Sequence, residues 1–167
     1  MRIMVKIKNR HRLKSKDIRI LNNELHKIFN VDFLDERAVV ETGDIEGFKT
    51  IFIDSEPCFI TLDNQTILTL YGVNKFKPVK KYVTVDMGAV KFVTNGADVM
   101  SPGIVDADKE IVENDQVWIR DMNNKKPLAI GIALMSGEDM ISKNKGKAIK
   151  IVHHVGDKIW NFFAKSL

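Results

Sequence analysis

One segment in the middle of the chain, residues 85–104, constrains the fold more than any other. It reads Val-Asp-Met-Gly-Ala-Val-Lys-Phe-Val-Thr-Asn-Gly-Ala-Asp-Val-Met-Ser-Pro-Gly-Ile. Residues 88–94 are long enough for two helical turns, Gly96 is placed to end them, and an apolar strand follows. We interpret Asp86, just before the helix, as a turn-capping group rather than a catalytic carboxylate. The segment therefore predicts a very short helix between two strands.

The rest of the second half continues this pattern of short strands. Alternating or apolar runs predict strands over 82–86, 99–105, 116–121, 128–134 and 148–154. Ser136 is a candidate N-cap for one more short helix, with Asp139 three residues later in an imperfect capping box. Short strands with two helical insertions predict a mostly β, closed or nearly closed barrel.

The first half is predicted to be an α+β domain. Alternation at Ile3, Val5 and Ile7 predicts a strand, and an apolar stripe predicts a helix over 16–29 with Ser15 as its N-cap. Four apolar segments separated by turn residues then predict an antiparallel meander packed on that helix, over residues 38–40, 48–53, 58–62 and 66–71. The basic, proline-containing segment 75–81 predicts a boundary between domains 1–75 and 76–167.

Positive charge is concentrated at the N-terminus. Residues 1–20 hold eight Lys or Arg and only one acidic residue, a local balance of +7, whereas the whole chain has a net charge of +4. A basic edge on a neutral-to-acidic body indicates a polyanionic partner, nucleic acid before membrane. A solvated face that serves only solubility is the alternative. No run approaches the 18 apolar residues of a membrane span, so we expect a cytoplasmic protein.

We find no complete catalytic or metal-binding motif in the sequence. No two of the ten glycines stand two apart, which excludes a G-x-G nucleotide fingerprint. An acidic run at 106–110 begins like a calcium loop, but Ile111 stands where glycine is required. His153 and His154 would point to opposite faces of a strand, one inward and one to solvent, so they would not share a metal ion. The single cysteine, Cys58, is interpreted as buried. We expect no enzyme activity, metal or cofactor.

Binding is the remaining function, and two surfaces are candidates. Gly96 and the Pro102–Gly103 loop would expose backbone amides to a phosphate, with Lys91 and Asn95 beside them. Each of these residues has a structural alternative, as a folding glycine or an ordinary solvated charge, and Phe92 is expected in the core. The full candidate RNA-binding set is Lys91, Asn95, Gly96, Ala97, Ser101, Pro102, Gly103, Lys147, Lys150 and His153, with Arg10, Arg12 and Lys14 in an expected strand-to-helix loop.

The second half resembles a PUA domain. The resemblance rests on Asp86-x-Gly-Ala-Val, on Asn95-Gly-Ala, on Pro102-Gly-Ile-Val and on residues 131–140. Residues 145–149 and 157–160 narrow the resemblance further. With them, the chain is similar to archaeal relatives of the malignant T-cell amplified sequence family. These pair an N-terminal α+β domain with a C-terminal PUA domain. The family often has two adjacent glycines where this chain has Gly96-Ala97.

The resemblance implies an RNA-binding protein with a translation-related, non-catalytic role. Its RNA would be tRNA or the RNA of the small ribosomal subunit. A separate translation factor or RNA-modifying protein is a possible partner class. Two alternatives stay open: a protein-interaction adaptor, and an RNA-targeting subunit for a separate RNA-modifying enzyme.

Overall fold

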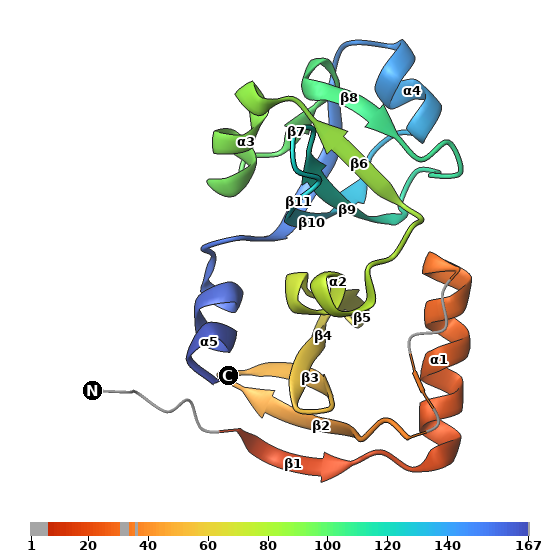
Figure 1. Cartoon of the computed structure of the whole chain (residues 1–167), viewed down its shortest axis with the longest axis vertical. Helices are drawn as coiled ribbons and strands as arrows, with labels where there is room; N and C mark the ends of the chain where they lie inside the picture. Colours follow the sequence, from red (N-terminus) through yellow and green to blue (C-terminus); the bar gives the residue numbers. More distant parts are fainter. Residues whose placement is uncertain (1–6, 31–33, 36, 167) are drawn as a thin grey trace. The chain divides into compact units, whose positions relative to one another are not determined.

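The fold comes from a computed structural model of the chain, which describes residues 7–30, 34–35 and 37–166. It contains two compact units (Figure 1). The first unit is Met1–Pro78 with Asn161–Leu167, and the second unit is Val79–Trp160. The sequence led us to assign all residues after 75 to one domain, but the C-terminal residues group with the first unit. There, Phe163 is buried and its ring meets Tyr71 edge-on, with centroids 6.0 Å apart.

The first unit is built on a five-stranded antiparallel sheet in the order β1-β2-β3-β4-β5. Three of its connections are two-residue hairpins, Glu46-Gly47, Asp54-Ser55 and Asp63-Asn64, and all six turn residues have positive φ. Such turns match the right-handed twist of the flanking strands. The elements are β1 (Lys8–Arg12), α1 (Ser15–Phe29), β2 (Val40–Ile45), β3 (Phe48–Ile53), β4 (Glu56–Leu62), β5 (Gln65–Leu68) and α2 (Leu70–Phe76).

Several expectations for the first unit need correction. Arg10 and Arg12 lie in strand β1, not in a loop, because β1 pairs with β2 as far as Arg12. Helix α1 begins at Ser15, so Lys14 and not Ser15 is its N-cap, and no side chain caps it. The expected strand at residues 3–7 falls almost entirely outside the described residues.

Helix α2 was not expected, since residues 66–71 were interpreted as a strand and 75–81 as a linker. The strand ends at Leu68 because Thr69 caps the helix: its Oγ1 accepts from the Gly72 N–H (3.1 Å) and donates to the Pro57 carbonyl (2.6 Å). A Cβ on Gly72 would lie 2.6 Å from the Cys58 carbonyl oxygen. Glycine at this position therefore allows α2 to pack directly on β4.

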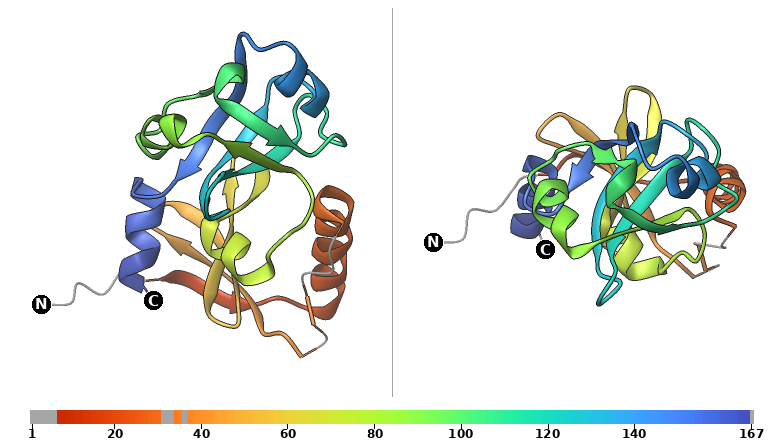
Figure 2. Two further views of the ribbon diagram at one scale, coloured as in Figure 1. Left: turned by 45° about the horizontal axis from the view of Figure 1, so that its top comes forward. Right: turned by 90° about the horizontal axis from the view of Figure 1, so that it is seen from above.

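The second unit is a mostly β, nearly closed pseudo-barrel, as the sequence predicts. Its six strands lie in the order β7-β11-β10-β9-β6-β8, antiparallel except for β6 with β9. Short helices α3 and α4 lie on opposite sides of it in the views of Figures 1 and 2. The elements are β6 (Tyr82–Val85), α3 (Met87–Thr94), β7 (Val99–Met100), the 3₁₀ turn η1 (Ser101–Gly103), β8 (Ile104–Ala107), β9 (Gln116–Asp121), β10 (Pro127–Ala133), α4 (Gly137–Ser142) and β11 (Lys147–His154). The last helix, α5 (Lys158–Ser166), begins in the second unit and belongs to the first unit from Asn161 on.

The turn η1 closes the barrel. The two edge strands, β7 and β8, are consecutive in the chain and are joined only by Ser101–Gly103. Ser101 is 1% exposed, and its hydroxyl donates to the Met140 carbonyl (2.7 Å) while its N–H donates to the Gly146 carbonyl. The expected continuous strand over 99–105 is therefore interrupted. Among the described residues, no helix is long and apolar enough to span a membrane.

Candidate functional site

The candidate site lies where α3 meets β7 and η1. Asp86 caps α3 as expected, because its Oδ1 accepts from the Ala89 N–H at 2.8 Å. The helix ends with two bonds typical of a Schellman motif: the Gly96 N–H donates to the Val93 carbonyl and the Ala97 N–H to the Phe92 carbonyl, both at 3.0 Å. Helix α3 therefore has the start and the end that its glycines and aspartate predict.

These bonds overturn one part of the expected chemistry. We expected the amides around Gly96 and Ala97 to be exposed for a phosphate, but both donate to helix carbonyls. The C-terminal end of a helix also carries partial negative charge, which disfavours an anion. The turn at Gly96-Ala97 is therefore a helix stop, and we drop it as a phosphate cradle.

Glycine at position 96 has two structural causes. Its φ is +86°, in the left-handed region that side chains disfavour, and a Cβ there would lie 2.9 Å from Nε2 of His154. The imidazole of His154 thus packs under the end of α3, with its Nδ1 2.9 Å from the Val155 carbonyl oxygen. The sequence pattern gave no indication of this contact.

Between α3 and η1 lies a groove with a volume of about 520 Å³. Phe92 and Met100 line it and are 56% and 46% exposed. The expectation that Phe92 lies in the core is wrong, because its neighbour Val93 takes the buried position of the helix. The lining residues are Asp86, Gly88, Ala89, Phe92, Val93, Ala97, Asp98, Val99, Met100, Pro102 and Gly103.

The polar side chains of the groove are already engaged. Of its two carboxylates, Asp86 caps α3, while Asp98 accepts from the Ile151 N–H (3.1 Å) and lies 3.6 Å from Nζ of Lys147. The free surface of the groove is therefore mainly apolar, and its lining includes four small residues, Gly88, Ala89, Ala97 and Gly103. Such a lining favours a flat apolar group over a phosphate.

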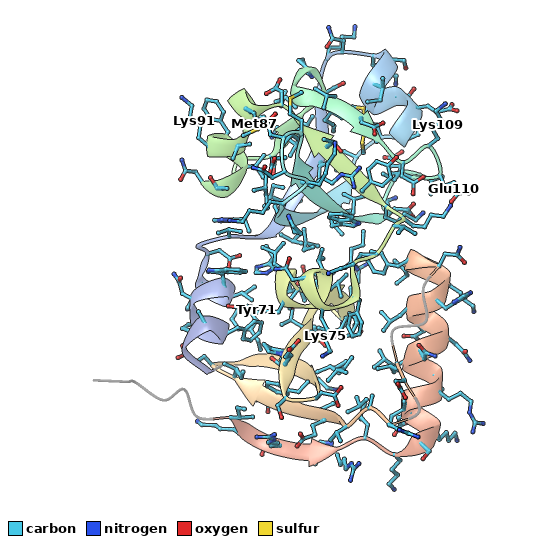
Figure 3. The ribbon with its side chains drawn as sticks, viewed as in Figure 1. Tyr71, Lys75, Met87, Lys91, Lys109 and Glu110 are labelled. Carbon is cyan, nitrogen blue, oxygen red and sulfur yellow. The ribbon has the colours of Figure 1, made fainter. Side chains whose placement is uncertain are left out.

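Cations lie around the groove rather than in it. Lys91 is exposed on α3, with its Nζ 5.1 Å from the centroid of the Phe92 ring. Figure 3 shows Lys91 and Met87 pointing outward from α3, on the side opposite Lys109 and Glu110. Lys147 pairs in register with Met100 of the groove, and Lys150 is exposed three residues further along β11. Asn95, another candidate, follows the last helical residue.

Two candidates are removed by burial. His153 is 0% exposed, and its Nδ1 lies 2.9 Å from Oδ2 of Asp157. Ser101 is buried, and both its hydroxyl and its N–H are engaged, as described above. Alternation along the strand correctly separated the two histidines, but it did not tell which of them points inward. His154 is the histidine that lies against Gly96, at the C-terminal end of α3.

The remaining candidates belong to the first unit. Arg10 forms a two-pronged hydrogen bond with Glu41, at 2.7 and 2.9 Å, so its charge is neutralised within the protein. Arg12 and Lys14 are exposed. Within the described part of the chain, no three His, Cys, Asp or Glu side chains are grouped as metal ligands.

Comparisons with known proteins agree with these two units. Residues 81–155 match the family described as PUA domain, and residues 9–76 match a domain of unknown function, DUF1947. The chain is 48% identical to the Methanocaldococcus jannaschii protein MJ1432, over 95% of this chain and 99% of that protein. It is 31% identical to translation machinery-associated protein 20 of Saccharomyces cerevisiae, over 93% of each.

Further matches extend the picture. The Drosophila melanogaster malignant T-cell-amplified sequence 1 homolog is 33% identical over 59% of this chain and 56% of its own length. The crystal structure of protein PH0734.1 from Pyrococcus horikoshii is 37% identical, with a TM-score of 0.80, and the alignment covers 91% of this chain and 98% of that one.

Proposed function

The chain belongs to the PUA-domain family that includes translation machinery-associated protein 20 and the malignant T-cell-amplified sequence proteins, and from this membership we propose that it binds structured RNA in a translation-related, non-catalytic role. The proposed RNA is tRNA or the RNA of the small ribosomal subunit, and the proposed location is the cytoplasm. The observation that carries the proposal is the apolar groove with lysines around it.

The groove fits an unpaired nucleobase. A base has two apolar faces and stacks on aromatic side chains, and Phe92 presents an exposed ring at the groove. Gly103 and Ala89 lie close together in the lining, because a Cβ added to Gly103 would lie 3.2 Å from the Cβ of Ala89. Small residues at these positions let a flat ring approach the backbone closely.

The lysines fit the phosphates that flank such a base. Lys91 and Lys150 are exposed and can neutralise phosphates that remain in solvent, whereas Lys147 is shared with Asp98. If Lys91 and Lys150 each neutralise one phosphate of a single strand, log K should fall with log salt with a slope of about −1.4. RNA recognition of this kind depends on single-stranded segments rather than on a helical groove.

The test combines identification of the RNA with a charge variant. Ultraviolet crosslinking in cells, followed by sequencing of the bound RNA, should recover tRNA or small-subunit ribosomal RNA. Recovery of no RNA above background would contradict the proposal. In vitro, Lys91→Gln with Lys150→Gln should weaken binding to total tRNA. The matched control is Lys109→Gln with Lys125→Gln, two exposed lysines of the same unit outside the groove lining.

A protein-interaction adaptor is the second candidate, and one observation favours it. Met87, Phe92 and Met100 together expose apolar surface near the groove, as at many protein interfaces. Binding of a protein segment there should respond little to salt. A salt slope near zero for the natural ligand would therefore favour the adaptor function.

The non-catalytic role has its own test. Transfer RNA incubated with the pure protein should keep its mass, and a mass change would show catalysis.

A further inference from the structure

We propose that the first unit carries a second RNA-binding surface, separate from the groove, that holds the phosphate backbone. This inference rests on the proposed RNA-binding function and extends it. The surface, called the β1–α1 surface, consists of five exposed cations on β1, at the N-cap of α1 and in the first two turns of α1: Lys8, Arg12, Lys14, Lys16 and Arg19.

Nearby acids balance the cations of this surface only in part. The five cations are opposed by Asp17 and by Asp44, which pairs in register with Lys8, while Arg10 and Glu41 neutralise each other. Among ion pairs between described residues, the Arg10–Glu41 pair is the one that involves this segment. The surface therefore carries a local charge of about +3, and it attracts polyanions.

Folding does not account for the cations on α1. The N-terminal end of a helix carries partial positive charge, so Lys16 in the first turn and Lys14 at the cap position are both unfavourable there. Lysine is also a poor N-cap, and its side chain makes no capping bond. Residues that lower the stability of their own helix are expected mainly at functional sites.

Edge protection explains only part of the surface. Strand β1 lies at the edge of its sheet, and charged residues on edge strands prevent unwanted strand pairing. That accounts for Lys8 and Arg12 on β1, and for the irregular register between Lys8 and His11. It does not account for Lys14, Lys16 and Arg19, which lie outside the strand.

The chemistry of the surface favours RNA over an acidic protein. Strand β1 reads Lys-Asn-Arg-His-Arg, all five residues are exposed, and none is apolar. Protein interfaces depend on buried aromatic or aliphatic anchors, which β1 lacks. Phosphate contacts need only cations and polar donors, and they fix the position of the RNA without reading its sequence. The groove would then take one base, and the β1–α1 surface would hold backbone elsewhere on the same RNA.

The test removes three of these charges: Arg12→Gln, Lys16→Gln and Arg19→Gln. If each neutralises one phosphate, binding to total tRNA at 0.15 M salt should weaken about 50-fold, and the salt slope should become shallower by about 2. Thermal stability should stay equal or rise, because two of the removed cations lie in the first turns of α1. The matched control removes three exposed cations of the same unit, with Arg37→Gln, Lys49→Gln and Lys77→Gln.

Each outcome decides a separate point. Unchanged affinity of the triple variant for tRNA, with the wild type binding, would overturn the second surface and leave the proposed function intact. Wild-type protein that binds no RNA would overturn both. A single-stranded pentanucleotide, long enough only for the groove, should bind the triple variant as well as the wild type. Polyglutamate and unlabelled RNA are compared as competitors of tRNA at equal total charge. If polyglutamate displaces tRNA to the same extent as the RNA does, the surface is assigned to acidic proteins instead.

Discussion

Replacement of Phe92 by alanine separates binding from folding more cleanly than any other single change at the groove. The ring is 56% exposed, so less than half of its apolar surface contributes to stability. Burial of a whole phenylalanine side chain is worth about 1.5–3 kcal/mol, so the partial burial here is worth about 1 kcal/mol. The contact of Lys91 with the ring adds about 0.5 kcal/mol at an exposed site. We therefore expect a folded variant that is destabilised by about 1–1.5 kcal/mol.

The effect on binding should be larger. Stacking of a base on an aromatic side chain is worth about 1–3 kcal/mol when measured by alanine substitution. Because about 1.4 kcal/mol corresponds to a tenfold change in affinity, Kd should rise by about 5- to 150-fold. The assay is fluorescence anisotropy with a labelled single-stranded pentanucleotide, and urea unfolding monitors the fold.

The control is Val112→Ala, which truncates a similarly exposed apolar side chain of the same unit outside the groove lining. It should leave Kd unchanged. If Phe92→Ala binds the pentanucleotide as tightly as wild type while it remains folded, the base is not stacked on Phe92. The interpretation of the groove as a base pocket would then be wrong.

Three further predictions concern groups away from the groove lining. Burial raises the pKa of the Cys58 thiol to about 12, so a disulfide reagent at pH 8 should label it only after unfolding; rapid labelling of native protein would contradict this. Burial alone would raise the pKa of the Asp157 carboxyl, but hydrogen bonds from His153 and from backbone amides lower this pKa overall. Ionised Asp157 therefore stabilises the fold fully above the ordinary pKa of aspartate, and this stabilisation is lost as the pH falls through the lowered pKa. Asp157→Asn should therefore lose less thermal stability than wild type between pH 6 and pH 3, and equal losses would refute the assignment. Gly96→Ala should cost about 1–3 kcal/mol in urea unfolding, because it adds a Cβ at positive φ against His154; no loss would show that the turn relaxes freely.

The second unit was the more predictable part of the fold because its signals are local. The Asp86 cap, the Gly96 stop and the Ser136 cap each depend on residues three or four positions apart, and the structure contains all three. Helix α2 was missed because Leu70 and Tyr71 continue the apolar run 66–71, which is typical of a strand. What decides it is the Thr69 cap and the close packing of Gly72 on β4, a contact between residues far apart in the chain.

The site was less predictable than the fold, for a related reason. Sequence patterns located the loops, but hydrogen-bond partners decide what a loop offers to a ligand. The amides at Gly96 and Ala97 are used by the helix end, and Ser101 is used by barrel closure. Phe92 was expected inside because helical spacing places it with Ala89 and Val93, but the packing of α3 buries Val93 and leaves Phe92 exposed. Only the register of the folded strands shows that His153 points inward and His154 lies against α3.

The turn η1 serves two purposes at once, and this has a consequence for how the groove behaves. Pro102 and Gly103 line the groove, and the same three-residue turn joins the two ends of the curled sheet. The pocket wall is thus anchored by the hydrogen bonds of Ser101 and by the bond from the Asp86 N–H to the Gly103 carbonyl. A guest would meet a preformed shape and would not have to pay for ordering a loose loop. Rigidity of this kind concentrates selectivity in the shape of the guest, since the wall cannot move without breaking these hydrogen bonds.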